Sequence, residues 1–133
     1  MLLTLCKSKL HRATVTQAEL HYEGSLTLDA ALMDGAGIVP FERVQVLDLN
    51  NGARFDTYAI EAPAESGTVC VNGAAARLVH PGDQIIVVTY AQLTPEEARR
   101  HRPVILLLNP DNTVRERITA DPAADARLLA EWD

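Results

Sequence analysis

One peptide bond in the sequence joins the two residue types that a self-cleavage reaction needs. Gly24-Ser25 is the only Gly-Ser step in the chain. A serine hydroxyl can attack the preceding carbonyl carbon, and a glycine there lets the backbone bend toward the hydroxyl because it has no Cβ. The amide becomes an ester, loss of the Ser25 α-proton leaves dehydroalanine, and hydrolysis yields a pyruvoyl group. Gly-Ser is also common in turns, so the dipeptide alone leaves both interpretations open.

Two polar side chains near the N-terminus have the spacing of one strand face, and one of them, Lys9, is a candidate for binding an anion. Lys9 and His11 are two residues apart, so an extended strand places both on one face. A solvated rim is the ordinary interpretation of this pattern. The formal net charge of -6 means that an anionic substrate would depend on local cations, of which Lys9 and Arg54 stand out. The histidines have no ligand spacing that indicates a metal site, so we expect no metal.

A second group lies after an Asn51-Gly52 hairpin signal. Arg54 and Tyr58 are four residues apart and share a face of a strand, whereas Thr57 points to the opposite face. An aromatic residue with its hydroxyl at the surface is the ordinary interpretation of Tyr58. If Thr57 also serves the Gly24-Ser25 bond, the strand must twist or bulge, or Thr57 must reach the bond from another side.

A third group is rich in small residues. Asn72-Gly73 is typical of a turn, and Ala74, Ala75 and Ala76 follow it. Three alanines are ordinary packing residues, but they also leave space for a ligand to reach backbone N–H groups. The pattern is therefore compatible with a plain turn or with a pocket wall.

The order and spacing of short segments resemble the pyruvoyl-dependent aspartate 1-decarboxylase family from the first residues to about Arg102. These segments are Lys9-Leu10-His11-Arg12, Leu20-His21-Tyr22-Glu23-Gly24-Ser25, Ala36-Gly37-Ile38, Asn51-Gly52, Arg54-Phe55, Thr57-Tyr58-Ala59-Ile60, Val71-Asn72-Gly73-Ala74-Ala75-Ala76, Gly82-Asp83 and Glu96-Glu97-Ala98-Arg99. Each is short, but together they are specific.

The resemblance implies a role for each candidate. Ser25 becomes the covalent pyruvoyl cofactor, which forms a Schiff base with L-aspartate, and no metal or pyridoxal phosphate is expected. Gly24 and Thr57 assist the cleavage, and Tyr58 donates the proton to the decarboxylated carbon. The residues implied in substrate binding are Lys9, Arg54, Asn72, Gly73, Ala74 and Ala75, with His11 and Tyr22 in support.

The resemblance also implies a small double-psi β-barrel and a homotetramer with active sites between subunits. Self-processing would divide the single domain into residues 1–24 and 25–133. The expected reaction converts L-aspartate to β-alanine and carbon dioxide, and so supplies pantothenate and coenzyme A synthesis. Whether maturation needs a helper protein stays open. The alternatives are a noncatalytic β-barrel interaction domain, purely structural self-cleavage, or decarboxylation of another amino acid.

Composition agrees with one compact, mainly β domain. The chain has 133 residues, of which 47% are hydrophobic and 23% charged, which favours a folded core. Its negative charge argues against nonspecific nucleic-acid binding. No apolar run approaches a membrane span, and the apolar start is too short for a signal peptide. Cys6 and Cys70 are expected to be reduced and buried, and the protein is expected to be cytoplasmic.

Short β-branched or alternating runs predict eight strands and two short helices. One helix is predicted from Asp29 to Asp34, ended by Gly35, and a capping sequence at Thr94 predicts the other. We interpret 121–133 as a tail helix or frayed end. The predicted strands are Leu2 to Val15, Ser25 to Leu28, Arg43 to Leu49, Arg54 to Ile60, Thr68 to Val71, Gln84 to Tyr90, Val104 to Leu108 and Val114 to Thr119.

Overall fold

A computed structural model describes residues 1–121. The predicted C-terminal tail, from about residue 120 onward, lies almost entirely outside the described residues. No helix within the described part is long and apolar enough to cross a membrane.

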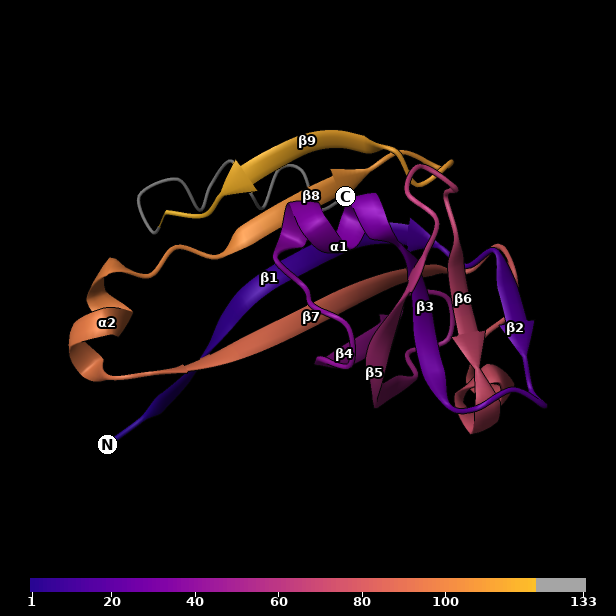
Figure 1. Ribbon diagram of the computed structural model, residues 1–133, viewed down its shortest axis with the longest axis horizontal. Helices are drawn as coiled ribbons and strands as arrows, with labels where there is room; N and C mark the ends of the chain where they lie inside the picture. The colour runs from indigo at the N-terminus through magenta and orange to yellow at the C-terminus, as the bar shows by residue number, and fades with distance from the viewer. Residues whose placement is uncertain (122–133) are drawn as a thin grey trace.

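Strands dominate the described chain, as predicted, and each of the eight predicted strands is present (Figure 1). Sequence reasoning missed one further strand, β2, because its three residues contain no apolar run. The strands are β1 (Leu3–Thr14), β2 (Gln17–Glu19), β3 (Ser25–Asp29), β4 (Arg43–Asp48), β5 (Arg54–Ala62), β6 (Val69–Asn72), β7 (Gln84–Leu93), β8 (Val104–Leu108) and β9 (Val114–Thr119).

The nine strands hydrogen-bond in the order β2-β6-β3-β5-β4-β7-β1-β8-β9. Most ladders are antiparallel, but β3 pairs with β5, β2 with β6 and β1 with β8 in parallel. This strongly curved mixed sheet is consistent with the small double-psi barrel that the resemblance implies, although within the described residues the hydrogen-bonded ladders do not close it. The order places β3 between β5 and β6, so two strands distant in sequence flank Ser25.

Three short helices connect the strands: α1 (Ala30–Ala36), η1 (Gly73–Leu78, a 3₁₀ helix) and α2 (Pro95–Arg100). Asp29 and Thr94 cap α1 and α2, as predicted, and Thr94 forms a full capping box with Glu97. The predicted end of α1 at Gly35 is wrong. Gly37 ends the helix with a φ of 68°, and its N–H reaches the carbonyls of the last turn.

The hairpin predicted at Asn51-Gly52 is present between β4 and β5, but its turn is not the two-residue type I′ turn that Asn-Gly usually forms. That turn requires positive φ at both residues, and of this pair only Gly52 has one, at 77°. The connection is longer, because the N–H of Asp48 bonds the carbonyl of Ala53 and the N–H of Gly52 bonds the carbonyl of Asp48. After this longer connection, strand β5 begins at Arg54.

The core lies under α1 and inside the curve of the sheet (Figure 1). Leu26 and Leu28 of β3 are fully buried in it, so the alternation of a strand turns Ser25 and Thr27 to the opposite face. Burying leucines of this size stabilises the fold by roughly 2 kcal/mol each, which fixes the register of β3. Other large members of the core are Leu10, Leu32, Met33, Val44, Val46, Ile85, Val87 and Leu106.

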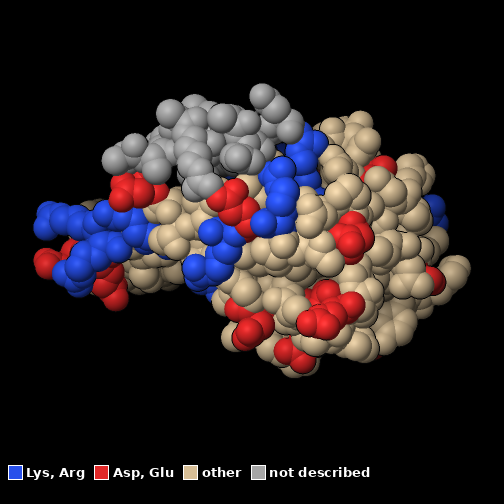
Figure 2. All heavy atoms as spheres, turned by 90° about the horizontal axis from the view of Figure 1, so that it is seen from above, with Lys and Arg blue, Asp and Glu red and all other residues tan. Residues whose placement is uncertain are grey.

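Charges are mixed at the end of the molecule formed by α2. The first turn of α2 carries Glu96 and Glu97, and the last turn carries Arg99 and Arg100. On the face shown in Figure 2, both signs of charge lie side by side at this end. This end therefore presents no uniform basic surface to a polyanion.

Candidate active site

Ser25 is the first residue of β3 and is almost fully buried, at 2% exposure. It lies opposite Asn72, the last residue of β6, in an antiparallel pair. The amide Nδ2 of Asn72 donates a hydrogen bond to Ser25 Oγ at 2.9 Å. The structure thus brings together two predicted site residues that are far apart in sequence.

Asn72 contacts two more polar side chains on the same face, and sequence reasoning missed both. Its Nδ2 also donates to Thr27 Oγ1 at 2.8 Å, and its Oδ1 accepts from Cys70 Sγ at 3.2 Å. Thr27 follows Ser25 by two positions and Cys70 precedes Asn72 by two. The period-2 alternation of strands was therefore a usable signal for both residues.

Gly73 allows the backbone around the candidate cleavage bond to pack closely. Its φ is 74°, and a Cβ added there would lie 2.6 Å from the Cα of Gly24 and 3.2 Å from the carbonyl oxygen of Tyr22. A side chain at position 73 would therefore displace Gly24. A Cβ added at Gly24 itself would meet nothing within 4 Å, and Gly24 is not among the residues with positive φ. In this structure the steric demand for glycine falls on Gly73.

Thr57 and Tyr58 lie on β5, next to β3. The parallel register pairs Leu26 with Ala59, so continuing it by one step places Tyr58 next to Ser25, with Thr57 before it on β5. Thr57 pairs with the buried Val44 across β4, so it shares the core-facing side of the sheet. Tyr58 pairs with the exposed Arg43, on the face that carries Ser25. These two neighbours have opposite orientations, as the alternation predicted, so Thr57 does not share the face that carries Ser25.

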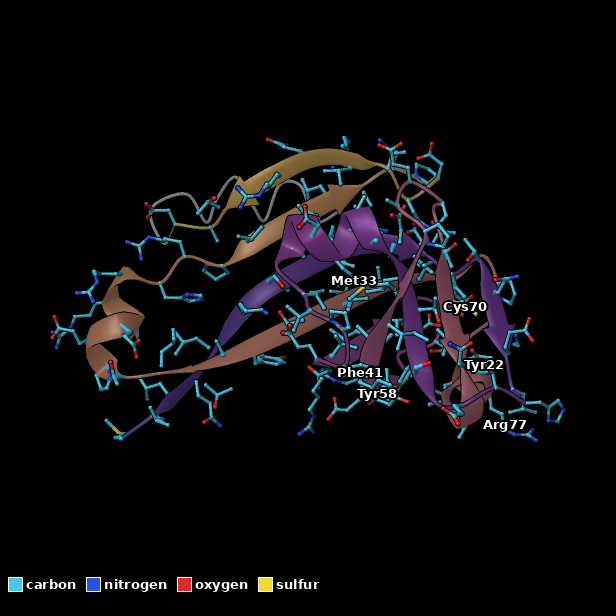
Figure 3. All side chains as sticks on the ribbon, in the orientation of Figure 1. Tyr22, Met33, Phe41, Tyr58, Cys70 and Arg77 are labelled. Atoms are coloured by element: carbon cyan, nitrogen blue, oxygen red, sulfur yellow. The ribbon has the colours of Figure 1, made fainter. Side chains whose placement is uncertain are left out.

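The ring of Tyr58 is half-buried and packs against Phe41, with ring centroids 6.2 Å apart (Figure 3). Phe41 is 76% exposed and has a φ of 70°, in the left-handed region that a bulky residue rarely adopts. Backbone bonds link Phe41 and Glu42 to Ala59 and hold this loop against β5. Sequence reasoning missed Phe41, and no local signal distinguished it from an ordinary surface aromatic residue.

The predicted cations are placed differently from Ser25. Lys9 is half-buried on β1, and β5, β4 and β7 separate β1 from β3 in the strand order. Arg54 is exposed at the start of β5, four residues before Tyr58. His11 is buried beside Lys9, and burial, with positive charge on Arg12, Lys9 and Arg115, lowers its pKa to about 4. At neutral pH His11 is therefore an uncharged group.

The small-residue segment forms η1, whose N-terminus adjoins Ser25. Asn72 precedes η1 but makes no side-chain cap, and its potential capping oxygen Oδ1 accepts from Cys70 Sγ. The first amides of a helix have no intrahelical acceptor, so the exposed Ala74 and half-buried Ala75 can present N–H groups to a ligand. The backbone carbonyl of Tyr22 lies close to Gly73, and the residue is 61% exposed.

Comparison with known proteins now places the chain. A model of the aspartate decarboxylase family matches residues 1–115. The chain belongs to the aspartate decarboxylase family. It is 56% identical to the aspartate 1-decarboxylase of Clostridium beijerinckii over 116 residues, which cover 87% of this chain and 94% of that protein.

Two further members of the family give the same result. The aspartate 1-decarboxylase of Maricaulis maris is 59% identical over 114 residues, covering 86% of this chain and 94% of that protein. That of Lactiplantibacillus plantarum is 49% identical over 131 residues, covering 98% of each chain. These family members match along nearly their whole length, so the similarity covers the whole described domain.

Family membership implies a pyruvoyl cofactor in general terms, and the surroundings of Ser25 fit one. The ketone oxygen of a pyruvoyl group would replace the backbone nitrogen of residue 25, while Oγ is lost during maturation. A ketone oxygen can only accept hydrogen bonds, and Asn72 Nδ2, which donates to Ser25 Oγ, supplies a donor beside this residue. Burial of Ser25 also keeps bulk water from this position. Within the described residues, no cluster of His, Cys, Asp or Glu could hold a metal ion.

Proposed function

We propose that this chain is an aspartate 1-decarboxylase that converts L-aspartate to β-alanine and carbon dioxide with a pyruvoyl group made from Ser25. The observation that carries the proposal is the buried hydrogen bond from Asn72 to Ser25 Oγ, with Gly73 packed on Gly24, in a chain of this family. The product would supply pantothenate and coenzyme A synthesis.

Maturation begins when Ser25 Oγ attacks the carbonyl carbon of Gly24. The C–N bond breaks, the nitrogen takes the hydroxyl proton, and an ester forms. Loss of the Ser25 α-proton then breaks the Cβ–O bond, which releases a Gly24 carboxylate and leaves dehydroalanine; water replaces its nitrogen, which leaves as ammonia. Asn72 stabilises the negative charge on Oγ as the hydroxyl loses its proton. Thr57 is proposed to polarise the Gly24 carbonyl, whose oxygen takes up the charge during attack. The products are residues 1–24 and a fragment that begins at position 25.

In turnover, the pyruvoyl group supplies an electron-accepting carbonyl for the pair left behind by carbon dioxide. The chain's own residues orient the substrate. Arg54 binds a carboxylate through its planar guanidinium group, and Lys9 is the second proposed cation. The N–H groups of Ala74 and Ala75 bind substrate, and Tyr58 donates the proton to the former α-carbon.

The placement of the cations supports a homotetramer with active sites between subunits. Lys9 lies on a strand separated from β3 by three others, so a neighbouring copy is the proposed source of the cation for each Ser25. Phe41 and Tyr22 expose large apolar surfaces near the candidate site, which subunit contact would bury. The proposed compartment is the cytoplasm, where free thiols such as Cys6 and Cys70 stay reduced.

The test measures carbon dioxide release from L-aspartate, L-glutamate and L-alanine by purified protein, with Ser25→Ala as the control. We expect release from aspartate alone and none from the control. Preferential release from another amino acid would transfer the activity to that substrate. A fully intact chain with no release from any amino acid would instead indicate a noncatalytic interaction domain.

A further inference from the structure

We propose that Cys70 is a positioning residue that holds the side-chain amide of Asn72 in the orientation that donates to Ser25. The inference rests on the proposed function and adds a residue that acts through Asn72. Cys70 itself is separated from the Ser25 hydroxyl by the intervening amide. Figure 3 shows Cys70 on β6, and its Sγ lies 3.2 Å from Asn72 Oδ1.

Four side chains form one hydrogen-bonded row across β6 and β3. Cys70 and Asn72 alternate along β6, and they pair with Thr27 and Ser25 of β3. Cys70 donates to Asn72 Oδ1, and Asn72 Nδ2 donates to both hydroxyl oxygens, at 2.9 Å and 2.8 Å. Cys70 is 5% exposed and Asn72 is 2% exposed, so water does not compete strongly for these groups.

The thiol selects between two orientations of the amide. If the Asn72 amide were turned over, its oxygen would face the two hydroxyls and its N–H groups would face sulfur, which is a weak acceptor. In the observed orientation the thiol supplies a donor to the amide oxygen, and both N–H groups meet oxygen. Without the thiol, the buried amide oxygen of Asn72 would have no hydrogen-bond donor, which is energetically unfavourable. The thiol therefore stabilises the observed orientation of the amide.

Amide orientation decides what happens to the proton of Ser25. With the N–H directed at Oγ, the Ser25 hydroxyl is an acceptor from Asn72 and directs its own proton to the Glu23 carbonyl, 3.3 Å away. Negative charge on Oγ, present as the hydroxyl loses its proton and before the charge passes to the Gly24 carbonyl oxygen, is then met by a donor. In the turned-over state, Oγ would instead donate to Asn72 and would lack that stabilisation.

The thiol is suited to donate rather than to react. Burial raises the pKa of Cys70, and negative charge on Glu19 raises it further, so the group keeps its proton at neutral pH. A protonated thiol is a hydrogen-bond donor, whereas a thiolate would repel the amide oxygen. The donor is therefore present at neutral pH.

The experiment follows cleavage of freshly expressed precursor over time by intact-protein mass spectrometry, comparing Cys70→Ser with Cys70→Val. Serine keeps a donor, and valine fills similar space without one. We expect the valine variant to cleave about fivefold more slowly, the effect of losing one weak hydrogen bond, and the serine variant to stay within about twofold of wild type. Urea unfolding of each variant, in a Ser25→Ala background that prevents cleavage, shows how much of any slower cleavage is due to a less stable fold.

Equal slowing in both variants would overturn the inference, because the effect would then follow packing rather than the donor. A double-mutant cycle gives a second test. Adding Cys70→Val to Asn72→Ala should cause no further slowing, and a further fivefold loss would contradict action through Asn72. A wild-type chain that stays intact would overturn the proposed function together with this inference. Cleavage of wild type and the valine variant at the same rate would overturn this inference alone.

Discussion

The pair of strands β3 and β6 differs from the strands that carry the candidate cations. On β3 and β6, Ser25, Thr27, Cys70 and Asn72 are joined by hydrogen bonds within one chain, and all but Thr27 are buried. The cations are spread over β1 and β5, on more open surfaces. Under the proposed function, the groups for self-cleavage lie within one chain, and the proposed homotetramer brings the cations to the substrate.

Physical chemistry gives a reason for this difference. A buried hydroxyl or amide without a partner costs roughly 1–3 kcal/mol, so the polar row on β3 and β6 must be satisfied as the chain folds. Exposed cations such as Arg54 are already solvated and need no partner in the folded monomer. Substitutions should therefore separate the two regions: changes on β6 should impair cleavage, and changes among the cations should impair turnover alone.

The largest effect is expected for Gly73→Ala. The new Cβ would lie 2.6 Å from Gly24 Cα in a left-handed backbone. Overpacking and left-handed strain together cost about 3 kcal/mol, so precursor cleavage should slow about 100-fold in a gel-shift time course. Gly52→Ala is the matched control, because Gly52 also has positive φ but open space around it. Normal cleavage of Gly73→Ala would show that the close packing on Gly24 is dispensable.

Tyr58→Phe should lower kcat about 100-fold and leave cleavage intact, because it removes a proposed proton donor but keeps the ring. The ring contact with Phe41 should persist in this variant. Steady-state kinetics on fully processed protein measures the effect. Full activity of the phenylalanine variant would exclude the Tyr58 hydroxyl as the donor.

Arg54→Ala should reduce kcat/KM for aspartate about tenfold, mainly through KM, since it removes one charge-assisted carboxylate contact. Arg43→Ala serves as the control, because Arg43 is exposed on the neighbouring strand and pairs with Asp56. Cleavage should proceed normally in both variants. Unchanged kinetics in fully processed Arg54→Ala protein would refute its proposed role.

A smaller effect, on stability alone, is expected at the loop that precedes Arg54. Asp48 is buried; burial, and then the neighbouring carboxyl group of Asp83, raise the pKa of Asp48, while the proximity of Asp48 lowers the pKa of Asp83. The folded protein therefore binds a proton on Asp48 more tightly than the unfolded chain does. As a result, the free energy of unfolding falls as pH rises through the raised pKa of Asp48. For Asp83 the stabilisation is lost as pH falls through its lowered pKa.

Asp48→Asn keeps a donor toward Asp83 without the charge. It should raise the free energy of unfolding at pH 7 by about 1 kcal/mol and flatten its decline with rising pH. Urea titrations across the pH range, in the Ser25→Ala background, measure this. A less stable asparagine variant at pH 7 would show that the ionised Asp48 is the stabilising form.

Much of the fold was accessible from the sequence because strands and caps are encoded locally. Runs of β-branched residues located eight strands, and Thr94 with Glu97 located α2. The end of α1 was misplaced because Gly35 and Gly37 are equally plausible stops in the sequence. Only the structure shows that a Cβ at Gly35 would contact Leu106, whereas Gly37 has the left-handed backbone that ends the helix.

The site was less accessible because it depends on which strands become neighbours. Nothing local places β3 between β5 and β6, so the residues around Ser25 could be proposed only through the family resemblance. Thr27 and Cys70 escaped attention although each lies two positions from a predicted residue. The close approach of Gly73 to Gly24 is a tertiary contact and has no signature in the sequence.

The central claim is that the chain cuts itself between Gly24 and Ser25 and converts residue 25 to a pyruvoyl group. Intact-mass analysis of incubated wild-type protein tests this directly. We expect one fragment of residues 1–24, and a second from residue 25 that is lighter by one ammonia than the same fragment with an N-terminal serine and that reacts with a carbonyl reagent. An uncleaved chain, or a fragment with an ordinary N-terminal serine, would contradict the claim.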